Sequence, residues 1–365
     1  MFFIFRRRWK QLEKEKANIS LQSAAQLRHC GLRLALRKGI GELCCRRRHI
    51  RRKVALPADT AALPLSIIIC TLGTCKVLED AIRAALMQDL AQSDYEVLVV
   101  WNRADAPPAA DFPPQVRWVR EPETGLSRAR NTGAAHARGA VLLFLDDDAV
   151  AAPNLASVMK ETFSRHKDAA IVGGQIFLPL PNPRPAAVLS GQEALWSAYR
   201  VPYRRYRTVR EPYAFPFGAC FAIRRGVLLA LGGFSENYGR IGENYAGGEE
   251  TALCYLSRQH GWNIGIQPKA QVEHRVEARR FTLTHAKKTL QAGIFTTYRL
   301  CLDGCTPFIW DLSYLKNRCA LAARELAQLE RGSLAYQYKK WEYEAFGALC
   351  MEEMKRRERP CADIG

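Results

Sequence analysis

The sequence has no uninterrupted apolar run that approaches the ~18 residues of a membrane-spanning helix. A secretory signal is not expected either, because apolar residues 2–5 precede the arginines at 6–8, whereas a signal carries its charges first. The twelve cysteines form no C-x-x-C pair and no zinc-binding pattern, and no internal repeat is present. These absences argue against a membrane-embedded, secreted, zinc-finger or repeat protein and favour a cytoplasmic one.

Positive charge is concentrated at the start of the chain. The formal net charge is +18, and residues 1–60 hold 16 Lys and Arg against 4 Asp and Glu, or +12, which leaves +6 for the rest. Such a segment binds an anionic membrane surface, binds nucleic acid or stays solvated. Because apolar residues 1–5 adjoin three arginines, we expect residues 1–60 to contact the cytoplasmic face of a membrane peripherally, with no nucleic acid partner.

Short apolar runs rich in β-branched residues alternate with amphipathic stretches after residue 64. The runs are typical of strands buried on both faces, and apolar residues at three- to four-residue spacing are typical of helices. Their alternation predicts an α/β fold with a mostly parallel sheet flanked by helices. The expected strands are 65–70, 95–101, 116–119, 141–145 and 170–177, and the expected helices are 77–90, 127–137, one opened by Pro153, and 252–260.

The same patterns divide the chain into three parts. Residues 1–62 are a basic N-terminal extension, residues 63–277 form the α/β domain, and residues 278–365 form a helical C-terminal region. Within the last part, residues 280–350 have helical character. The final fifteen residues are polar and are expected to be loose.

Three adjacent carboxylates, Asp146, Asp147 and Asp148, directly follow the expected strand 141–145. Ligands of parallel α/β sheets bind at such carboxyl ends of strands. The three groups repel one another unless a cation neutralises them, and oxygen ligands shared with a diphosphate suit Mg²⁺ or Mn²⁺. The alternative is a solvated turn with a helix cap before Pro153.

Two arginines lie at an expected helix start just upstream of the aspartates. Gly125 and Ser127 suit a turn and a helix cap, and the N-terminus of the helix that follows favours an anion. Arg128 and Arg130 are then placed to bind phosphate. The alternative is a capped structural helix with two surface arginines.

Acidic residues and a histidine mark two later segments. The glycine pair at 247–248 brings Glu249 and Glu250 to an expected helix start, where a carboxylate can act as general base. The alternative is an ordinary acidic first turn, which the helix dipole favours. His274 lies near an expected strand end, and a lone histidine there is more often a hydrogen-bonded structural residue than a ligand.

Taken together, these motifs resemble in content and order the family 2 glycosyltransferases, which have the GT-A fold. The resemblance covers roughly residues 65–277. The separate motifs are weak to moderate, but their joint occurrence in one order is highly specific. The matching stretches are 66–71, 96–102, 125–131, 144–149, 231–234 and 248–250.

The resemblance implies a role for each matched residue. Asp146 and Asp148 correspond to the D-x-D motif, with Asp148 the direct metal ligand, and His274 corresponds to a histidine that helps bind the metal or diphosphate. Glu250 corresponds to the catalytic base, with Glu249 as the alternate candidate. The implied ligands of the nucleotide-sugar are Thr71, Asn102, Arg128, Arg130, Asp146 and Asp147.

Two positions depart from the family pattern. Trp101 stands where the second strand commonly ends in an aspartate that contacts the nucleoside, which leaves the base preference open. The catalytic pair is Glu249-Glu250 in place of Glu-Asp, and the extra methylene puts the position of the base in doubt.

The implied activity is that of an inverting, Mn²⁺- or Mg²⁺-dependent hexosyltransferase. It would move a sugar from a nucleotide-diphosphate sugar, expected to be UDP-linked, to a hydroxyl of a polysaccharide or lipid-linked glycan in cell-envelope biosynthesis. Three alternatives stay open: a degenerate, non-catalytic relative, a basic protein that binds nucleic acid or membrane, and a nucleotidyltransferase. The last lacks support because residues 71–76 do not form a glycine-rich basic loop.

Overall fold

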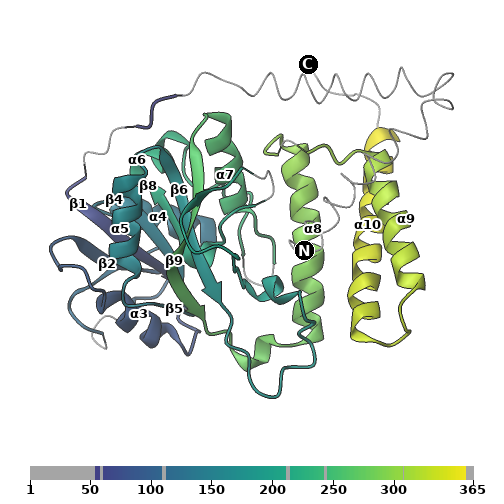
Figure 1. The fold of residues 1–365 in the computed structure, drawn as a ribbon, viewed down its shortest axis with the longest axis horizontal. Coiled ribbons are helices and arrows are strands. Elements are labelled where there is room, and N and C mark those ends of the chain that lie inside the picture. The colour runs from purple at the N-terminus through teal and green to yellow at the C-terminus, as the bar shows by residue number, and fades with distance from the viewer. Residues whose placement is uncertain are drawn as a thin grey trace.

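The computed structural model describes residues 54–57, 61–108, 112–210, 214–241, 245–306 and 308–358. Most of the basic extension, with its expected membrane contact, therefore lies outside the described residues. Nine strands form one sheet in the order β3-β2-β1-β4-β8-β6-β9-β5, with β7 paired to β9 (Figure 1). Their bounds are β1 Leu63–Thr71, β2 Tyr95–Trp101, β3 Val116–Arg120, β4 Gly139–Asp146, β5 Ala149–Ala151, β6 Ala169–Phe177, β7 Arg207–Thr208, β8 Phe221–Arg224 and β9 Asn263–His274.

The sheet is parallel on one side and mixed on the other. Strand β1 pairs in parallel with both β2 and β4, and β2 pairs in parallel with β3. Strand β8 is antiparallel to its neighbours β4 and β6, whereas β6 and β9 are parallel. The short strands β5 and β7 are antiparallel to β9. The predicted α/β fold is confirmed, and its mixed half depends on short strands that the sequence pattern did not mark.

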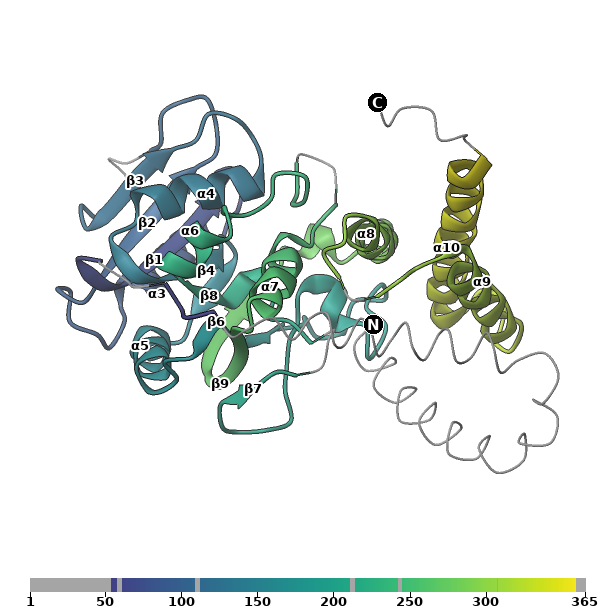
Figure 2. The same cartoon turned by 90° about the horizontal axis from the view of Figure 1, so that it is seen from above.

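Helices cover both faces of the sheet, as Figure 2 shows. Successive residues of β1 point to opposite faces: Ile67 and Ile69 pack with α3 and α5, whereas Ile68 packs with α4, α6 and α7. All three are fully buried, and each contributes roughly 1.5–3 kcal/mol through removal of its side chain from water. The bounds of these helices are α3 Leu78–Leu86, α4 Leu126–His136, α5 Leu155–Arg165, α6 Arg225–Ala230 and α7 Glu249–Gln259.

Helix α3 ends four residues earlier than its apolar spacing predicts. The side-chain amide of Gln88 donates to the carbonyls of Ala84, 2.8 Å away, and Ala152, 3.1 Å away. The backbone N–H of Asp89 donates to the carbonyl of Pro153. Because these groups bond to the segment before α5, the chain turns away from α3 at this point.

The predicted helical character of residues 280–350 is confirmed: among the described residues, three α-helices follow the sheet, α8 Leu283–Leu302, α9 Leu312–Ala327 and α10 Leu334–Glu358. They enclose a separate apolar cluster together with Trp196, which comes from the 3-10 turn η2 Glu193–Trp196 of the irregular segment after β6. Among the described residues, no helix combines the length and apolar character needed to cross a bilayer.

The expectation of a loose end is wrong for residues 351–358, which are the last two turns of α10. Glu353 explains why this polar stretch is ordered. Its carboxylate is buried and accepts hydrogen bonds from the Tyr298 hydroxyl at 2.8 Å and from Arg356 and Arg357. A buried carboxylate with these partners ties the end of α10 to α8.

Candidate active site

Two carboxylates and a histidine meet where β4 and β9 end and β5 begins. Asp146 is the last residue of β4, and the chain turns through Asp148 into β5, whose Ala149 pairs with His274 of β9. The His274 Nε2 lies 2.7 Å from Asp148 Oδ1 and 3.8 Å from Asp146 Oδ2. One ligand atom from each of the three residues lies within 4.8 Å of the others. We call Asp146, Asp148 and His274 the metal cluster, because together they could hold a metal ion.

The environment of His274 selects the nitrogen that faces the aspartates. The ring is 1% exposed, and its Nδ1 lies 3.0 Å from the carbonyl of Trp196, to which it must donate. Nε2 is therefore the atom presented to the carboxylates. Burial lowers the pKa of His274, but the hydrogen bond and charge of Asp148 raise it more, so the net shift is upward.

The donor set fits a divalent cation. Metal-bound histidines commonly donate their second ring N–H to a carbonyl, as His274 does to Trp196. Burial raises the pKa of Asp148, but His274 and Arg280 lower it more, so the carboxyl group stays ionised as a metal ligand must. Two carboxylates and an imidazole suit Mn²⁺ better than Mg²⁺, which prefers oxygen alone.

The middle aspartate points elsewhere. Asp147 Oδ2 accepts a hydrogen bond of 2.6 Å from the hydroxyl of Thr71, the last residue of β1. Burial, with the charges of Asp148 and Asp146 adding to it, raises the pKa of Asp147 to about 7. Thr71 and Asp147 thus connect the carboxyl ends of adjacent strands, and neither belongs to the metal cluster.

Arg130 of α4 links the metal cluster to the acidic pair of α7. Its guanidinium is 3% exposed; Nη1 lies 2.7 Å from Glu249 Oε1 and 2.8 Å from Glu250 Oε1, and Nη2 lies 3.4 Å from Asp146 Oδ1. Gly218 makes this approach possible, because a Cβ there would fall within 3.0 Å of both the Arg130 and Glu250 side chains. The site therefore contains one buried cation surrounded by three carboxylates.

The two glutamates differ in access to solvent. The Glu249 side chain is 3% exposed and the Glu250 side chain 15%. Burial and the neighbouring charge of Glu250 raise the pKa of Glu249 against the effect of Arg130, and its Oε2 is buried without a hydrogen-bond partner in the described structure. Glu250 is therefore the more solvent-accessible of the two carboxylates.

The side chain of Asn102 forms hydrogen bonds with three backbone groups. It is 4% exposed, its amide donates to the carbonyls of Glu121 and Glu123, and its oxygen accepts from the N–H of Gly125. The residue thereby holds the loop that leads into α4. The structure leaves its predicted contact with the nucleoside untested.

Trp101 ends β2 with its ring buried. Its indole Nε1 donates to Asp105 at 3.2 Å, and Arg103 lies over the ring at 5.4 Å. A Cβ at Gly73, whose φ is +70°, would overlap the ring, so Gly73 gives Trp101 its place. The carboxylate next to this strand end comes from Asp105, which the sequence pattern did not mark.

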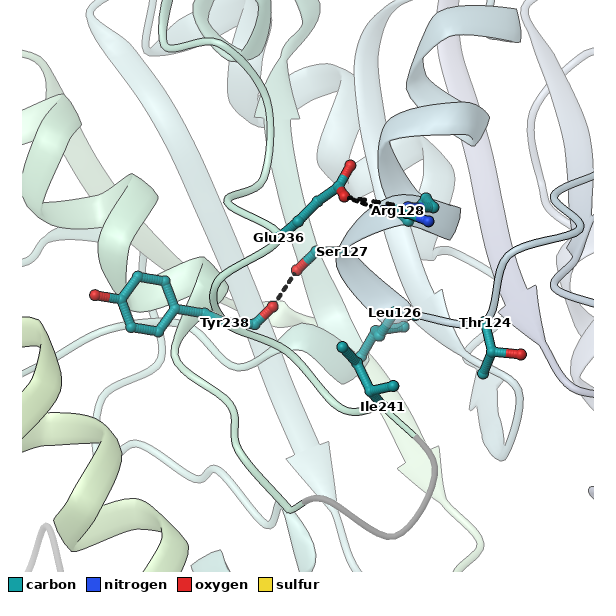
Figure 3. Close-up of a pocket in the computed structure, with 8 residues that line it drawn as sticks. Thr124, Leu126, Ser127, Arg128, Glu236, Tyr238 and Ile241 are labelled. Carbon is teal, nitrogen blue, oxygen red and sulfur yellow. Dashed lines mark hydrogen bonds and ion pairs between the residues drawn. The ribbon is translucent and has the colours of Figure 1, made fainter.

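Arg128 is not brought to the metal cluster. It forms ion pairs with Glu236 and Glu123, and it borders a cavity of about 180 Å³ at the start of α4 (Figure 3). Ser127, beside it, donates its hydroxyl to the carbonyl of Tyr238 at 2.7 Å. Of the two arginines expected to bind phosphate, only Arg130 reaches the acidic cluster.

Sequence reasoning missed Arg280 and Gly218. Arg280 Nη1 lies 2.8 Å from Asp148 Oδ2, and its side chain is 24% exposed, so it places a cation beside the metal cluster. It comes from η4 Ala278–Arg280, directly after β9. No local spacing links it to an aspartate 132 residues earlier, and only the sheet order brings the two together.

The family model described as "Glycosyl transferase family 2" matches residues 66–232. A "Glucosyl-dolichyl phosphate glucuronosyltransferase" of Haloferax volcanii is 23% identical over 221 residues, covering 59% of this chain and 70% of that protein. An uncharacterised protein of Sinorhizobium fredii is 25% identical over 232 residues, covering 59% of this chain but only 25% of that protein.

A solved structure is similar over most of the chain. It is a mannosyltransferase from Pyrobaculum calidifontis in complex with GDP-Man and Mn²⁺, with a TM-score of 0.51 at 17% identity. The similarity covers 87% of this chain and 95% of that one. At this identity it shows the shared fold, an α/β sheet with a helical C-terminal region.

Proposed function

Because the chain belongs to glycosyl transferase family 2, we propose that it is an inverting transferase that moves a sugar from a nucleotide-diphosphate sugar to a hydroxyl acceptor. One observation carries the proposal: Arg130 joins the metal cluster of Asp146 to the acidic pair at the start of α7. Such an arrangement supports a leaving-group site and a base that share one buried network. Both are needed for a displacement at an anomeric carbon.

The side of the site formed by Asp146, Asp148 and His274 would bind the diphosphate. Asp148, Asp146 and His274 would bind Mn²⁺ or Mg²⁺, with Mn²⁺ favoured by the imidazole. A bound divalent cation supplies positive charge to the diphosphate as it leaves. Arg280 adds a second, protein-borne cation next to Asp148.

On the other side, Glu250 removes the proton of the acceptor hydroxyl. Its greater exposure favours it over Glu249, and Arg130 fixes the position of its carboxylate. The hydroxyl oxygen then attacks the anomeric carbon as the bond to the diphosphate breaks. A single displacement of this kind inverts the anomeric configuration. Glu249, buried behind the same guanidinium, is the alternate base.

A lipid-linked glycan or a polysaccharide is the proposed acceptor. The name of the Haloferax relative refers to a glucosyl-dolichyl phosphate, which supports a lipid-linked acceptor. Peripheral contact of residues 1–60 with the cytoplasmic face of a membrane agrees with such an acceptor and stays a proposal. The nucleotide is also open: UDP is expected from the sequence, whereas the similar solved structure contains GDP-Man.

Release of the nucleoside diphosphate tests the activity. Purified full-length protein is incubated with Mn²⁺, a lipid-linked glycan or polysaccharide acceptor and a panel of UDP- and GDP-sugars, and the released UDP or GDP is measured. We expect one donor to react, and Glu250→Gln to lower its rate by about 10²–10⁴. The matched control is Glu79→Gln, an exposed carboxylate on α3. Absence of release from every donor, with nucleotide still bound, would favour the non-catalytic alternative.

A further inference from the structure

A run of arginines lies on the surface, and none of them belongs to the described site. Residues 199–210 contain five arginines and no acidic residue: Arg200, Arg204, Arg205, Arg207 and Arg210. This run, the arginine strip, contributes +5. Residues 61–365 carry +6 in total, so all their other residues together contribute only +1. Most of the net positive charge of residues 61–365 therefore lies in one short segment.

The segment has an apolar inner side that accounts for its position. Tyr199 and Val209 are buried in the core cluster beside α5, and Val201 packs against the same cluster. The N–H of Val201 donates to the side chain of Gln175, and that of Val209 donates to the carbonyl of Ile264. Figure 2 shows β7, within this segment, beside β9 at the margin of the sheet. Packing against the core thus explains the apolar residues of the segment. It does not explain why the exposed residues between them are arginines.

All five arginines are exposed. Within the part of the chain that the structure describes, no ion pair joins Arg204, Arg205 or Arg210 to a carboxylate, and Arg207 only lies over the ring of Tyr203 at 4.9 Å. Some exposed arginines elsewhere, such as Arg83 of α3, are paired with an acidic neighbour. Unpaired like charges repel one another, and an anionic partner removes that repulsion.

We infer that the arginine strip docks the protein on an anionic lipid surface. Guanidinium groups spread over a surface suit phosphate headgroups, and each basic residue near an anionic bilayer strengthens binding about fivefold. Single-stranded nucleic acid is less suitable, because it needs exposed aromatic rings for base stacking. In the strip, the ring of Tyr206 is stacked on His166 and that of Tyr203 is covered by Arg207.

The inference rests on the proposed function, because a lipid-linked acceptor is anchored in a membrane. It adds to that function a surface that binds the membrane. It names a second surface, distinct from residues 1–60. Vesicle binding needs neither nucleotide nor metal. Loss of vesicle binding would therefore not contradict the proposed donor site. Absence of donor binding would not contradict the proposed membrane surface.

The test is sedimentation of the full-length protein with vesicles of phosphatidylcholine and phosphatidylglycerol, with pure phosphatidylcholine vesicles as the neutral comparison. The strip variant replaces Arg204, Arg205, Arg207 and Arg210 with Gln. The matched control replaces four exposed basic residues of α8, α9 and the turn after α9 with Gln: Arg299, Lys316, Arg324 and Arg331. Circular dichroism and thermal melting check that both variants fold.

We expect the strip variant to bind anionic vesicles at least about tenfold more weakly than the wild type, and the control to change by less than about threefold. Neutral vesicles should bind none of the three proteins. Equal losses in both variants, or no loss in either, would overturn the inference, because residues 1–60 or overall charge would then account for binding. Unchanged vesicle binding with lost affinity for single-stranded DNA would identify nucleic acid as the partner instead.

Discussion

Replacing Gly218 with Ala should disable the site without unfolding the protein. The new Cβ would lie closer than 3.0 Å to Oε1 of Glu250 and to the Arg130 guanidinium, so both groups must shift, that of Glu250 by about 1 Å. Neither can swing into solvent freely, because Arg130 is 3% exposed and holds three carboxylates. The backbone itself tolerates alanine, since Gly218 is not among the residues with positive φ.

Two magnitudes follow from this displacement. A misplacement of about 1 Å in a reacting group costs roughly 10²-fold in rate. Loss of one charged hydrogen bond between Arg130 and Glu250 lowers the free energy of unfolding by roughly 1.5–3 kcal/mol. Activity should therefore fall about a hundredfold while the chain remains folded.

The assay is the initial rate of nucleoside diphosphate release from the best donor, read beside a thermal melt of each variant. Gly347→Ala on α10 is the matched control, because nothing lies within 4 Å of its new methyl group. It should keep the wild-type rate and gain up to about 1 kcal/mol from helix propensity. A Gly218→Ala rate within threefold of the wild type would refute the proposed role of the Arg130 network.

Three other changes have predictable effects. Arg130→Met leaves the buried Glu249 carboxylate without its partner, so the free energy of unfolding in urea should fall by about 3–5 kcal/mol. An unchanged unfolding midpoint would contradict the stabilising role of the Arg130 network. Asn102→Ala frees the backbone of the loop before α4, which hydrogen exchange at Gly125 should detect as faster exchange. Hydrogen bonds from its arginine neighbours lower the pKa of Glu353 from 4.5 to about 2, so its stabilisation is complete above pH 4.5 and is lost as the pH falls towards 2. Solvent screens the exposed arginine partners, so Glu353 contributes about 1–2 kcal/mol to the free energy of unfolding. Glu353→Gln should remove this acid-dependent part. Identical pH profiles of the unfolding free energy in the wild type and the variant would contradict the assignment.

Local sequence patterns predicted β1 and β2, which are long strands buried on both faces. The β-branched run of β1 identifies a buried strand because Ile67, Ile68 and Ile69 all lose contact with water. Strand β8 has only four residues, and its antiparallel position between β4 and β6 depends on partners far away in the chain. Nothing in its own composition indicates that position.

In the candidate site too, some residues could be predicted from local sequence, whereas others depend on partners far away in the chain. Asp146 and Asp148 were recognisable because three carboxylates follow one strand. The ion pair between Arg130 and Glu249 joins residues 119 positions apart, and it turned an expected phosphate ligand into the centre of a buried network. The pairing of Arg128 with Glu236, 108 positions away, likewise removed that side chain from the cluster. Such contacts are set by the packing of helices on the sheet, which periodicity does not encode.

Calorimetric titration of UDP and GDP, each with and without Mn²⁺, tests the donor site most directly, on the wild type and on Asp148→Asn. We predict that one nucleotide binds only when Mn²⁺ is present and that Asp148→Asn weakens it at least about 100-fold, since even changes behind a metal ligand cost 10–100-fold. Metal-independent binding, equal binding by the variant, or no binding of either nucleotide would contradict a metal-dependent donor site at Asp146, Asp148 and His274.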